Sequence, residues 1–350
     1  MPRLLALALA ALTAAGCNSY IPDCGDEGCG LAPVRVLMLN GGDSTDGSFG
    51  RYDPVTGTVD STALAGGATQ GLADGSDGFL YVTLPEAGRV DIFDEATLRR
   101  TGTVPVPGAR HVAFGPNERM YVTSRTAAGA SDVVMVDRDT RAVLGSVPVG
   151  GAANGIVVSG TRLYVATGAD GVSHEVVVLD TRTDAVVDRV DVGCAPRFVL
   201  TNGRGNEPVD VFAVCTGTER DEVVALSGLT GRIAGRFDVG GAVSTAGPGR
   251  MAVVDYAPGG ETLFVARADG AVVRFPLRPD VPPVVTPLGG DPIVAVAHDP
   301  VTDELYVARV RGRGRRGYVT VHNVAGAELR RFPSGGPSPV ALRVPPPYVL

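Results

Sequence analysis

Five polar residues recur along the chain, each two positions before the first apolar residue of a short apolar segment. They are spaced by roughly forty to fifty residues, and three of the five are arginines. Guanidinium groups that converge attract carboxylates and phosphates and can bind them through paired hydrogen bonds. We therefore expect a ligand-binding cluster if the fold brings these positions together; alternatively, the arginines satisfy carbonyl groups and pair with nearby acids such as Asp291. The five residues are Gln70, Arg110, Asn154, Arg197 and Arg250.

One residue of this region is a candidate for acid–base catalysis. His111 directly follows Arg110 and could act as a general base, or it could simply line a polar channel. The sequence has no lysine, which excludes Schiff-base chemistry, and no Gly-x-Ser-x-Gly nucleophile elbow. The other histidines, His174, His298 and His322, show no spacing typical of metal ligands. We predict no metal and no cofactor, and we favour binding over catalysis.

The polar residues belong to a repeated unit of about the length of a propeller blade. An aromatic residue inside a β-rich segment marks six copies of the unit. In a seventh copy, Leu37 and Met38 stand in place of the aromatic residue. The markers are Tyr81, Tyr121, Tyr164, Phe212, Phe264 and Tyr306.

A second motif accompanies several of the copies: an aspartate with a threonine three positions on. An aspartate side chain can accept backbone N–H groups and hold a tight turn, and Gly57 and Gly231 can supply a positive φ angle in two copies. A role that repeats in every unit of a repeat protein is usually structural, so we interpret these aspartates as turn formers. The pairs are Asp53–Thr56, Asp94–Thr97, Asp137–Thr140 and Asp180–Thr183.

The marker segments resemble a known family. Leu80-Tyr81-Val82-Thr83 and Met120-Tyr121-Val122-Thr123 are similar to the core of YVTN β-propeller repeat proteins, and the likeness extends from about residue 34 to residue 344. The resemblance implies an all-β chain and a location outside the cytoplasm, since the family is known mostly from extracytoplasmic and surface proteins. It implies no particular ligand.

The repeat predicts a seven-bladed propeller of four-stranded antiparallel blades. The first unit supplies only three strands, near residues 34–39, 48–53 and 59–64. We expect the C-terminal segment 339–344 to pair beside residues 34–39 and close the ring, which removes two sheet edges. Residues 34–350 would then form a single domain. The five polar residues would meet at one mouth of its central channel, with Ile293 and Pro339 in the remaining two blades.

The N-terminus predicts export and lipid attachment. Residues 1–16 have a charged start at Arg3, an apolar run and small residues before Cys17, as in a bacterial lipoprotein signal peptide. Cys17 would carry the lipid, and residues 17–33 would form the tether. Asn18 after the cysteine is compatible with sorting to the outer membrane, facing the periplasm or the exterior. The alternative is ordinary cleavage, with Cys17 free or disulfide-bonded.

The other four cysteines predict two disulfides in an oxidising compartment. If residues 197–200 and 210–214 are adjacent antiparallel strands, Leu200 lies opposite Asp210 and Cys194 comes close to Cys215. Cys24 and Cys29 would then pair within the tether. A metal site there is an alternative, but zinc usually requires two short cysteine pairs or cysteines with histidines.

Charge narrows the range of partners. The net charge is −7, without the basic footprint of a nucleic-acid-binding protein. The one basic cluster is a glycine-rich run that we interpret as a solvated loop; contact with anionic lipid headgroups or an acidic partner is the alternative. Its residues are Arg309, Arg311, Arg313, Arg315 and Arg316.

These features predict a lipid-anchored propeller that acts as a binding or scaffold module in the bacterial cell envelope. We expect a protein, peptide or polysaccharide partner, membrane contact through the anchor only, and a monomer. The alternative function is a lactonase-like propeller hydrolase that uses His111 and the arginines at the channel mouth. A quinone-dependent dehydrogenase is disfavoured, because its repeats resemble a tryptophan-bearing motif and this chain has no tryptophan.

Overall fold

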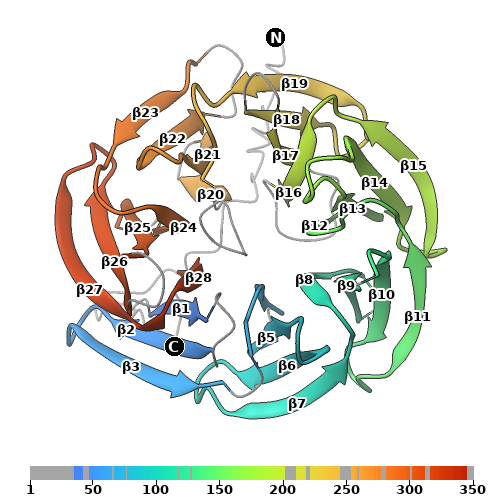
Figure 1. Ribbon diagram of the computed structural model, residues 1–350, viewed down its shortest axis with the longest axis horizontal. Coiled ribbons are helices and arrows are strands. Elements are labelled where there is room, and N and C mark those ends of the chain that lie inside the picture. Colours follow the sequence, from blue (N-terminus) through green and yellow to red (C-terminus); the bar gives the residue numbers. More distant parts are fainter. Residues whose placement is uncertain are drawn as a thin grey trace, which may run out of the picture.

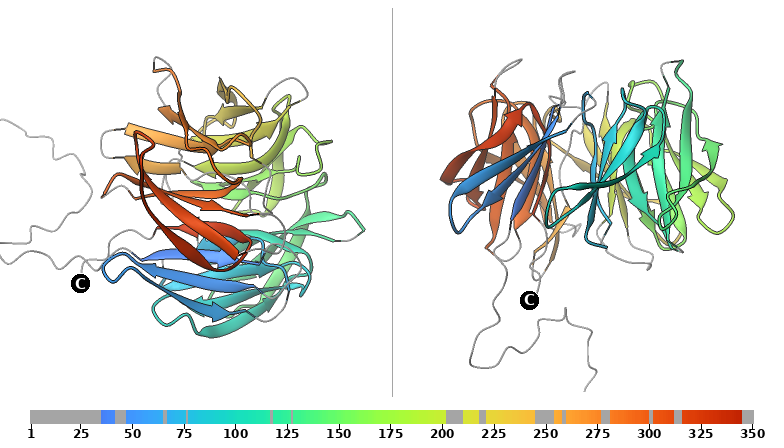
Figure 2. Two further views of the ribbon diagram at one scale, coloured as in Figure 1. Left: turned by 60° about the vertical axis from the view of Figure 1, so that its left-hand side comes forward. Right: turned by 90° about the horizontal axis from the view of Figure 1, so that it is seen from below.

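The computed structural model describes residues 35–41, 47–64, 67–75, 77–116, 118–126, 128–201, 210–217, 221–244, 254–257, 260–276, 281–299, 302–311 and 316–344. Seven four-stranded antiparallel sheets form a ring around a central axis (Figure 1). From the side, the sheets stand around the axis as twisted blades (Figure 2). The predicted all-β, seven-bladed propeller is therefore confirmed. Within the described ranges, no helix is long and apolar enough to cross a membrane.

Each blade begins at the channel and runs outward, strand by strand. Blade 1 contains β4 (Leu72–Asp74), β5 (Phe79–Leu84), β6 (Arg89–Asp94) and β7 (Arg100–Pro105). Blade 2 contains β8 (Ala109–Phe114), β9 (Arg119–Arg125), β10 (Ser131–Asp137) and β11 (Val143–Pro148). Blade 3 contains β12 (Ile156–Ser159), β13 (Arg162–Ala166), β14 (Glu175–Asp180) and β15 (Ala185–Asp191). Blade 4 contains β16 (Ala195–Thr201), β17 (Val211–Thr216), β18 (Glu222–Leu226) and β19 (Ile233–Asp238).

The remaining blades follow the same order. Blade 5 contains β20 (Val254–Ala257), β21 (Gly260–Ala266), β22 (Ala271–Pro276) and β23 (Val284–Pro287). Blade 6 contains β24 (Ile293–Asp299), β25 (Glu304–Arg309), β26 (Arg316–Asn323) and β27 (Glu328–Pro337). Blade 7 contains β28 (Pro339–Arg343), β1 (Val36–Asn40), β2 (Ser48–Asp53) and β3 (Thr58–Ala63).

Blade 7 joins the two ends of the described chain. β28 pairs antiparallel with β1, with Leu37 opposite Arg343 and Met38 opposite Leu342, as the closure hypothesis predicts. The chain therefore enters β1 and leaves β28 at the same end of the blade. The inner strands begin at the opposite end, which we call the mouth face.

The core lies between the blades and consists mainly of valine, leucine and alanine. Leu37 and Leu39 of blade 7, for example, pack in one cluster with Leu80 and Val82 of blade 1. The outermost strands are far more exposed, as Leu144 in β11 illustrates with 54% of its surface accessible. Each blade thus depends on its neighbours to bury its two faces.

The aromatic markers make contacts between blades. The hydroxyl of Tyr121 in blade 2 donates to the carbonyl of Thr181 (3.3 Å) and lies 3.2 Å from Asp184 Oδ1, both in the outer turn of blade 3. Burial raises the pKa of Tyr121 to about 12. Tyr164 of blade 3 donates to the carbonyl of Gly228 in blade 4 in the same way, at 3.3 Å. The marker residue therefore fastens each of these blades to the next.

The aspartate–threonine pairs form turns between the third and fourth strands. Asp137 Oδ1 accepts the backbone N–H and the hydroxyl of Thr140, each at 2.7 Å. These bonds lower the pKa of Asp137. The residue after the threonine has a positive φ angle, 69° at Gly57 and 61° at Arg141. The turn is strong enough to hold a non-glycine residue in the left-handed region in most copies.

The disulfide Cys194–Cys215 is confirmed, with a Cα–Cα distance of 5.6 Å. The strand register used to predict it is wrong: Leu200 lies opposite Phe212 rather than Asp210. An irregularity between Pro196 and Phe198 shifts the register by one residue and places Pro196 opposite Cys215. This bulge brings Cys194 one residue closer to Cys215 along the ladder than the register of residues 198–201 would. Cys17, Cys24 and Cys29 lie outside the described residues.

Candidate functional site

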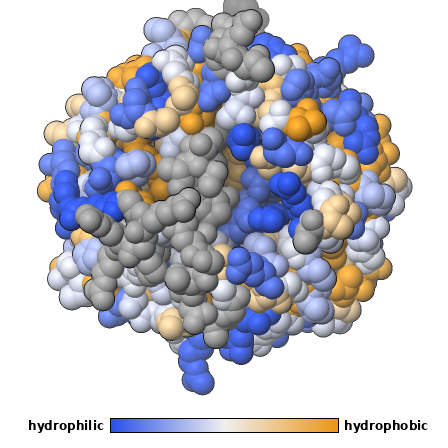
Figure 3. Space-filling view, in the orientation of Figure 1, coloured by the Kyte–Doolittle hydropathy of each residue, from blue (hydrophilic) through white to orange (hydrophobic). Residues whose placement is uncertain are grey.

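The mouth face brings together most of the predicted polar residues. Gln70 and Asn154 stand just before inner strands β4 and β12, while Arg110 and Arg197 lie at the starts of β8 and β16. Hydrophilic residues gather beside the centre of the view in Figure 3, over the inner strands of blades 2 and 3. Arg250 lies outside the described residues.

Three of these residues form one hydrogen-bonded chain across three blades. A terminal nitrogen of Arg110 donates to Gln70 Oε1. Gln70 Nε2 donates to Asn154 Oδ1 at 3.0 Å, and Asn154 Nδ2 donates to the carbonyl of Arg197 at 2.9 Å. The Arg197 guanidinium turns away, donating to the hydroxyl of Thr216 and the carbonyl of Ala169, each at 2.9 Å. Gln70, Arg110 and Asn154 thus form a cluster, which Arg197 joins only through its backbone.

The charge of the cluster is not neutralised by the described residues. Within that part of the chain, neither Arg110 nor Arg197 forms an ion pair with a carboxylate. Asp291, expected as a partner, instead binds Tyr318 and Arg311. Burial and the nearby charge of Arg125 lower the pKa of Arg110. A partly buried cation of this kind favours the approach of an anion.

His111 lies in β8 at the edge of this cluster and is only 8% exposed. Its ring meets Phe198 edge to face, with centroids 5.0 Å apart. Its Nε2 is buried and has no hydrogen-bond partner among the described residues. Burial, aided by the charge of Arg110, lowers its pKa to about 4, so the imidazole is neutral at pH 7. Such a weak base is poorly matched to proton abstraction near neutrality.

Two threonines that the sequence analysis did not single out hold the mouth in place. Thr83 Oγ1 accepts the N–H of Gly71 and donates to the carbonyl of Arg110, both at 2.7 Å. Thr123 Oγ1 accepts the N–H of His111 at 3.0 Å and donates to the carbonyl of Asn154 at 2.6 Å. Each hydroxyl links the mouth residues of two neighbouring blades. The available signal was the threonine at the same position of both Tyr-Val-Thr segments.

The aligned positions of blades 6 and 7 are apolar. Ile293, at the start of β24, is 1% exposed, and its carbonyl accepts the hydroxyl of Ser244 at 2.5 Å. Pro339 begins β28 and is buried. The polar cluster therefore occupies the part of the mouth formed by blades 1 to 4.

The arginine-rich run behaves differently from a solvated loop where it is described. Arg309 is 2% exposed, and its Nη1 donates to the carbonyls of Gly289 and Asp291, each at 2.6 Å. The prediction of a solvated side chain is therefore wrong for Arg309, which links β25 to the segment before β24. Arg311 lies over the ring of Tyr318. Arg313, Arg315 and the side chain of Arg316 lie outside the described residues.

The remaining histidines are separate from the mouth cluster. His298 Nε2 lies 2.9 Å from Asp303 Oδ1 at the far end of β24, and His322 Nε2 lies 2.9 Å from Thr320 Oγ1 in β26. His322 thus lies in the third strand of its blade, not the outermost. His174 is exposed. Within the described ranges, no three histidine, cysteine or acidic residues form a group able to hold a metal ion.

No family model and no curated protein matches the sequence. Several solved structures share the fold. A quinonprotein alcohol dehydrogenase-like protein from Bacteroides thetaiotaomicron is 14% identical, with a TM-score of 0.65, covering 89% of this chain and 77% of that chain. A "putative 6-phosphogluconolactonase" from Bacteroides uniformis is 15% identical, with a TM-score of 0.64. The match covers 89% of this chain and 99% of that chain.

A third similar structure is the hydrazine synthase of Kuenenia stuttgartiensis, 19% identical with a TM-score of 0.58, covering 73% of this chain and 76% of that chain. At such low identity, the three likenesses establish the architecture and nothing about chemistry. The chain is thus similar in fold to propeller proteins with differently named activities.

Proposed function

We propose that this protein is an extracytoplasmic binding module whose channel mouth takes an anionic group of a cell-envelope partner. One observation carries the proposal: Arg110 and Arg197 are partly buried, and neither pairs with a carboxylate among the described residues. An incoming carboxylate or phosphate would receive charge-assisted hydrogen bonds in a partly desolvated site.

The chain path is compatible with a lipid anchor at Cys17. β1 begins and β28 ends on the face opposite the mouth, because Leu37 pairs with Arg343. A lipid attached before β1 would favour a mouth directed away from the membrane. The buried disulfide Cys194–Cys215 also supports residence in an oxidising compartment. The proposed partner is therefore a protein, peptide or polysaccharide of the cell envelope.

A lactonase-like hydrolase is the second candidate. The fold similarity to the Bacteroides uniformis protein and the unpartnered Nε2 of His111 motivate it. The low pKa of His111 disfavours it, because a base that protonates near pH 4 removes protons poorly at pH 7. Hydrolysis of a lactone by the purified protein, lost in His111→Gln, would favour this candidate over the binding module.

The test is affinity capture of cross-linked partners from envelope membranes, using the full chain. The triple variant Arg110→Gln, Arg197→Gln and Arg250→Gln is compared with wild type and with a control, Arg182→Gln. Arg182 is an exposed residue paired locally with Asp180, so its loss leaves the mouth intact. We expect recovery of the partner to fall at least tenfold in the triple variant only. Equal recovery by all three proteins would refute a role for the mouth.

A further inference from the structure

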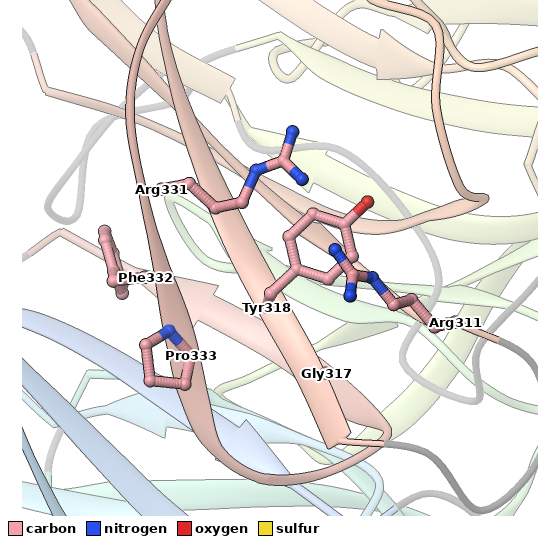
Figure 4. A pocket seen from close by; sticks show the side chains of 6 residues that line it. All are labelled: Arg311, Gly317, Tyr318, Arg331, Phe332 and Pro333. Carbon is pink, nitrogen blue, oxygen red and sulfur yellow. The ribbon is translucent and has the colours of Figure 1, made fainter.

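Blade 6 carries a second cluster of arginines on its outer strands, on the side of the mouth face. An open groove of about 350 Å³ lies between the start of β26 and the middle of β27 (Figure 4). The mouth cluster shares no residue with it. Its lining residues are Arg311, Gly317, Tyr318, Arg331, Phe332 and Pro333.

Two guanidinium groups lie against one aromatic ring in this groove. The guanidinium carbon of Arg311 is 4.7 Å from the centroid of Tyr318, and that of Arg331 is 5.0 Å away (Figure 4). The ring is 8% exposed, and its hydroxyl donates to Asp291 Oδ2 at 2.8 Å. The tyrosine therefore fixes both arginines by cation–π contact while it is held in place itself.

Both arginines keep N–H groups available to solvent. The side chain of Arg311 is 52% exposed and that of Arg331 is 46% exposed. Pre-ordered guanidinium groups with open N–H edges can bind a carboxylate without first losing their own side-chain entropy.

Among the described residues around the groove, guanidinium groups outnumber carboxylates. Arg331 forms two hydrogen bonds with Glu328, at 3.0 and 2.9 Å, and Arg311 lies 3.5 Å from Asp291. Arg309 lies behind the groove and donates to two carbonyls and a hydroxyl, and no described carboxylate forms an ion pair with it. Three guanidinium groups therefore face two carboxylates, which leaves one positive charge for a monoanionic ligand.

The remaining wall is apolar and firmly supported. Phe332 stacks on Tyr52 of blade 7, with centroids 3.7 Å apart, and Pro333 follows it at the surface. A Cβ atom at Gly317 would lie 2.1 Å from Pro339 Cδ, so blades 6 and 7 meet too closely there for a side chain. The groove thus has an apolar side at Pro333, on the same strand as Arg331, which the buried Phe332 supports from behind.

We propose that this groove binds a carboxylated sugar ring of an acidic polysaccharide. The carboxylate would accept hydrogen bonds from Arg311 and Arg331, and the apolar face of the ring would lie against Pro333. The volume favours a pyranose ring over a free phosphate or an aspartate side chain, each of which would leave most of the groove empty. The site is independent of the mouth cluster.

Calorimetric titration of the full chain with tetragalacturonate tests the proposal. We expect millimolar or tighter binding that weakens with added salt, and at least a tenfold loss in the double variant Arg311→Gln, Arg331→Gln. The double variant Arg99→Gln, Arg182→Gln removes the same charge from exposed positions of blades 1 and 3 and should bind like wild type. The share of binding that is lost in Arg311→Gln, Arg331→Gln should persist in the variant Arg110→Gln, Arg197→Gln, which separates this site from the mouth.

Three results would overturn the proposal. The first is an absence of binding by wild type or unchanged affinity in the groove variant. The second is equal affinity for the methyl-esterified oligomer, which has no carboxylate charge. The third is equally tight binding of tetraglutamate, which would assign the groove to an acidic peptide instead. Unchanged far-ultraviolet circular dichroism and melting temperature in each variant would exclude misfolding as the cause of a loss.

Discussion

The mouth cluster and the blade 6 groove both contain arginines, but their guanidinium groups are used differently. At the mouth, Arg110 and Arg197 direct N–H groups to side chains and carbonyls of their own and neighbouring blades. In the groove, Arg311 and Arg331 are about half exposed and lie against Tyr318. Arginine near the channel serves partly as a link between blades, whereas the groove arginines pair with carboxylates of their own blade and keep about half of each side chain exposed.

The same linking role recurs away from the mouth. Arg189 of blade 3 donates to the carbonyl of Val149 after blade 2 at 2.9 Å, and Arg236 of blade 4 donates to that of Val192 after blade 3 at 2.8 Å. A guanidinium can reach a carboxylate of its own blade and a carbonyl of the next at once, which a compact ammonium does poorly. This use offers a physical reason why every basic side chain other than histidine is arginine in this chain.

Removing the strand that closes the ring should lower stability more than any other change, because the mouth cluster and the groove both depend on the closed ring. We expect a chain ending at Gly336, and so lacking β28, to lose cooperative thermal unfolding, since β1 and the inner face of blade 7 would be exposed. Circular dichroism melting measures this. A chain ending at Val344 retains β28 and is the matched control. A truncated chain that melts like the intact protein would show that closure contributes little.

The distinction between arginines that link blades and arginines that line the groove can be tested by comparing how much each kind stabilises the fold. Arg309→Gln should lower the free energy of unfolding by about 3 kcal/mol, because buried carbonyls lose a charged donor. Arg331→Gln should change it by no more than about 0.5 kcal/mol, because its ion pair is half exposed. Urea denaturation measures both. Similar losses in the two variants would remove the distinction between the two kinds of site.

Acid should lower the stability of the whole propeller through His111 at the mouth. His111 has a folded-state pKa of about 4, below its unfolded value of about 6.5, so the unfolded chain binds the extra proton first. The neutral His111 therefore stabilises the folded protein fully above pH 6.5, and this stabilisation is lost as the pH falls toward 4. At pH 5 the loss in free energy of unfolding is roughly 2 kcal/mol. Burial also lowers the pKa of His322, so part of the acid sensitivity has another source.

Urea denaturation at pH 7 and at pH 5 measures how much of the acid-induced loss of stability comes from His111. The variant His111→Gln should lose less stability between the two pH values than wild type, whereas His174→Gln, at an exposed position, should behave like wild type. Equal pH dependence in all three proteins would place the acid-sensitive group elsewhere.

Most of the fold could be predicted from the sequence because its signals are local and repeated. The aromatic markers, the aspartate–threonine turns and the unpaired C-terminal segment fixed the number of blades and the closure of the ring, since each unit must bury both faces against copies of itself. The disulfide was predicted correctly from a wrong register. Pairing at the loop end of the hairpin is offset by two residues, the bulge at residues 196–198 recovers one of them, and spacing alone reveals neither.

The sequence by itself determined which residue types recur at the channel and that positive charge is concentrated between residues 309 and 316. Only the tertiary structure decided what each guanidinium does. Arg309 is buried while Arg311, two residues later, is half exposed, and Arg331 reaches Tyr318 from another strand. Side-chain partners depend on the distances between neighbouring strands and blades, which packing sets and local sequence does not encode.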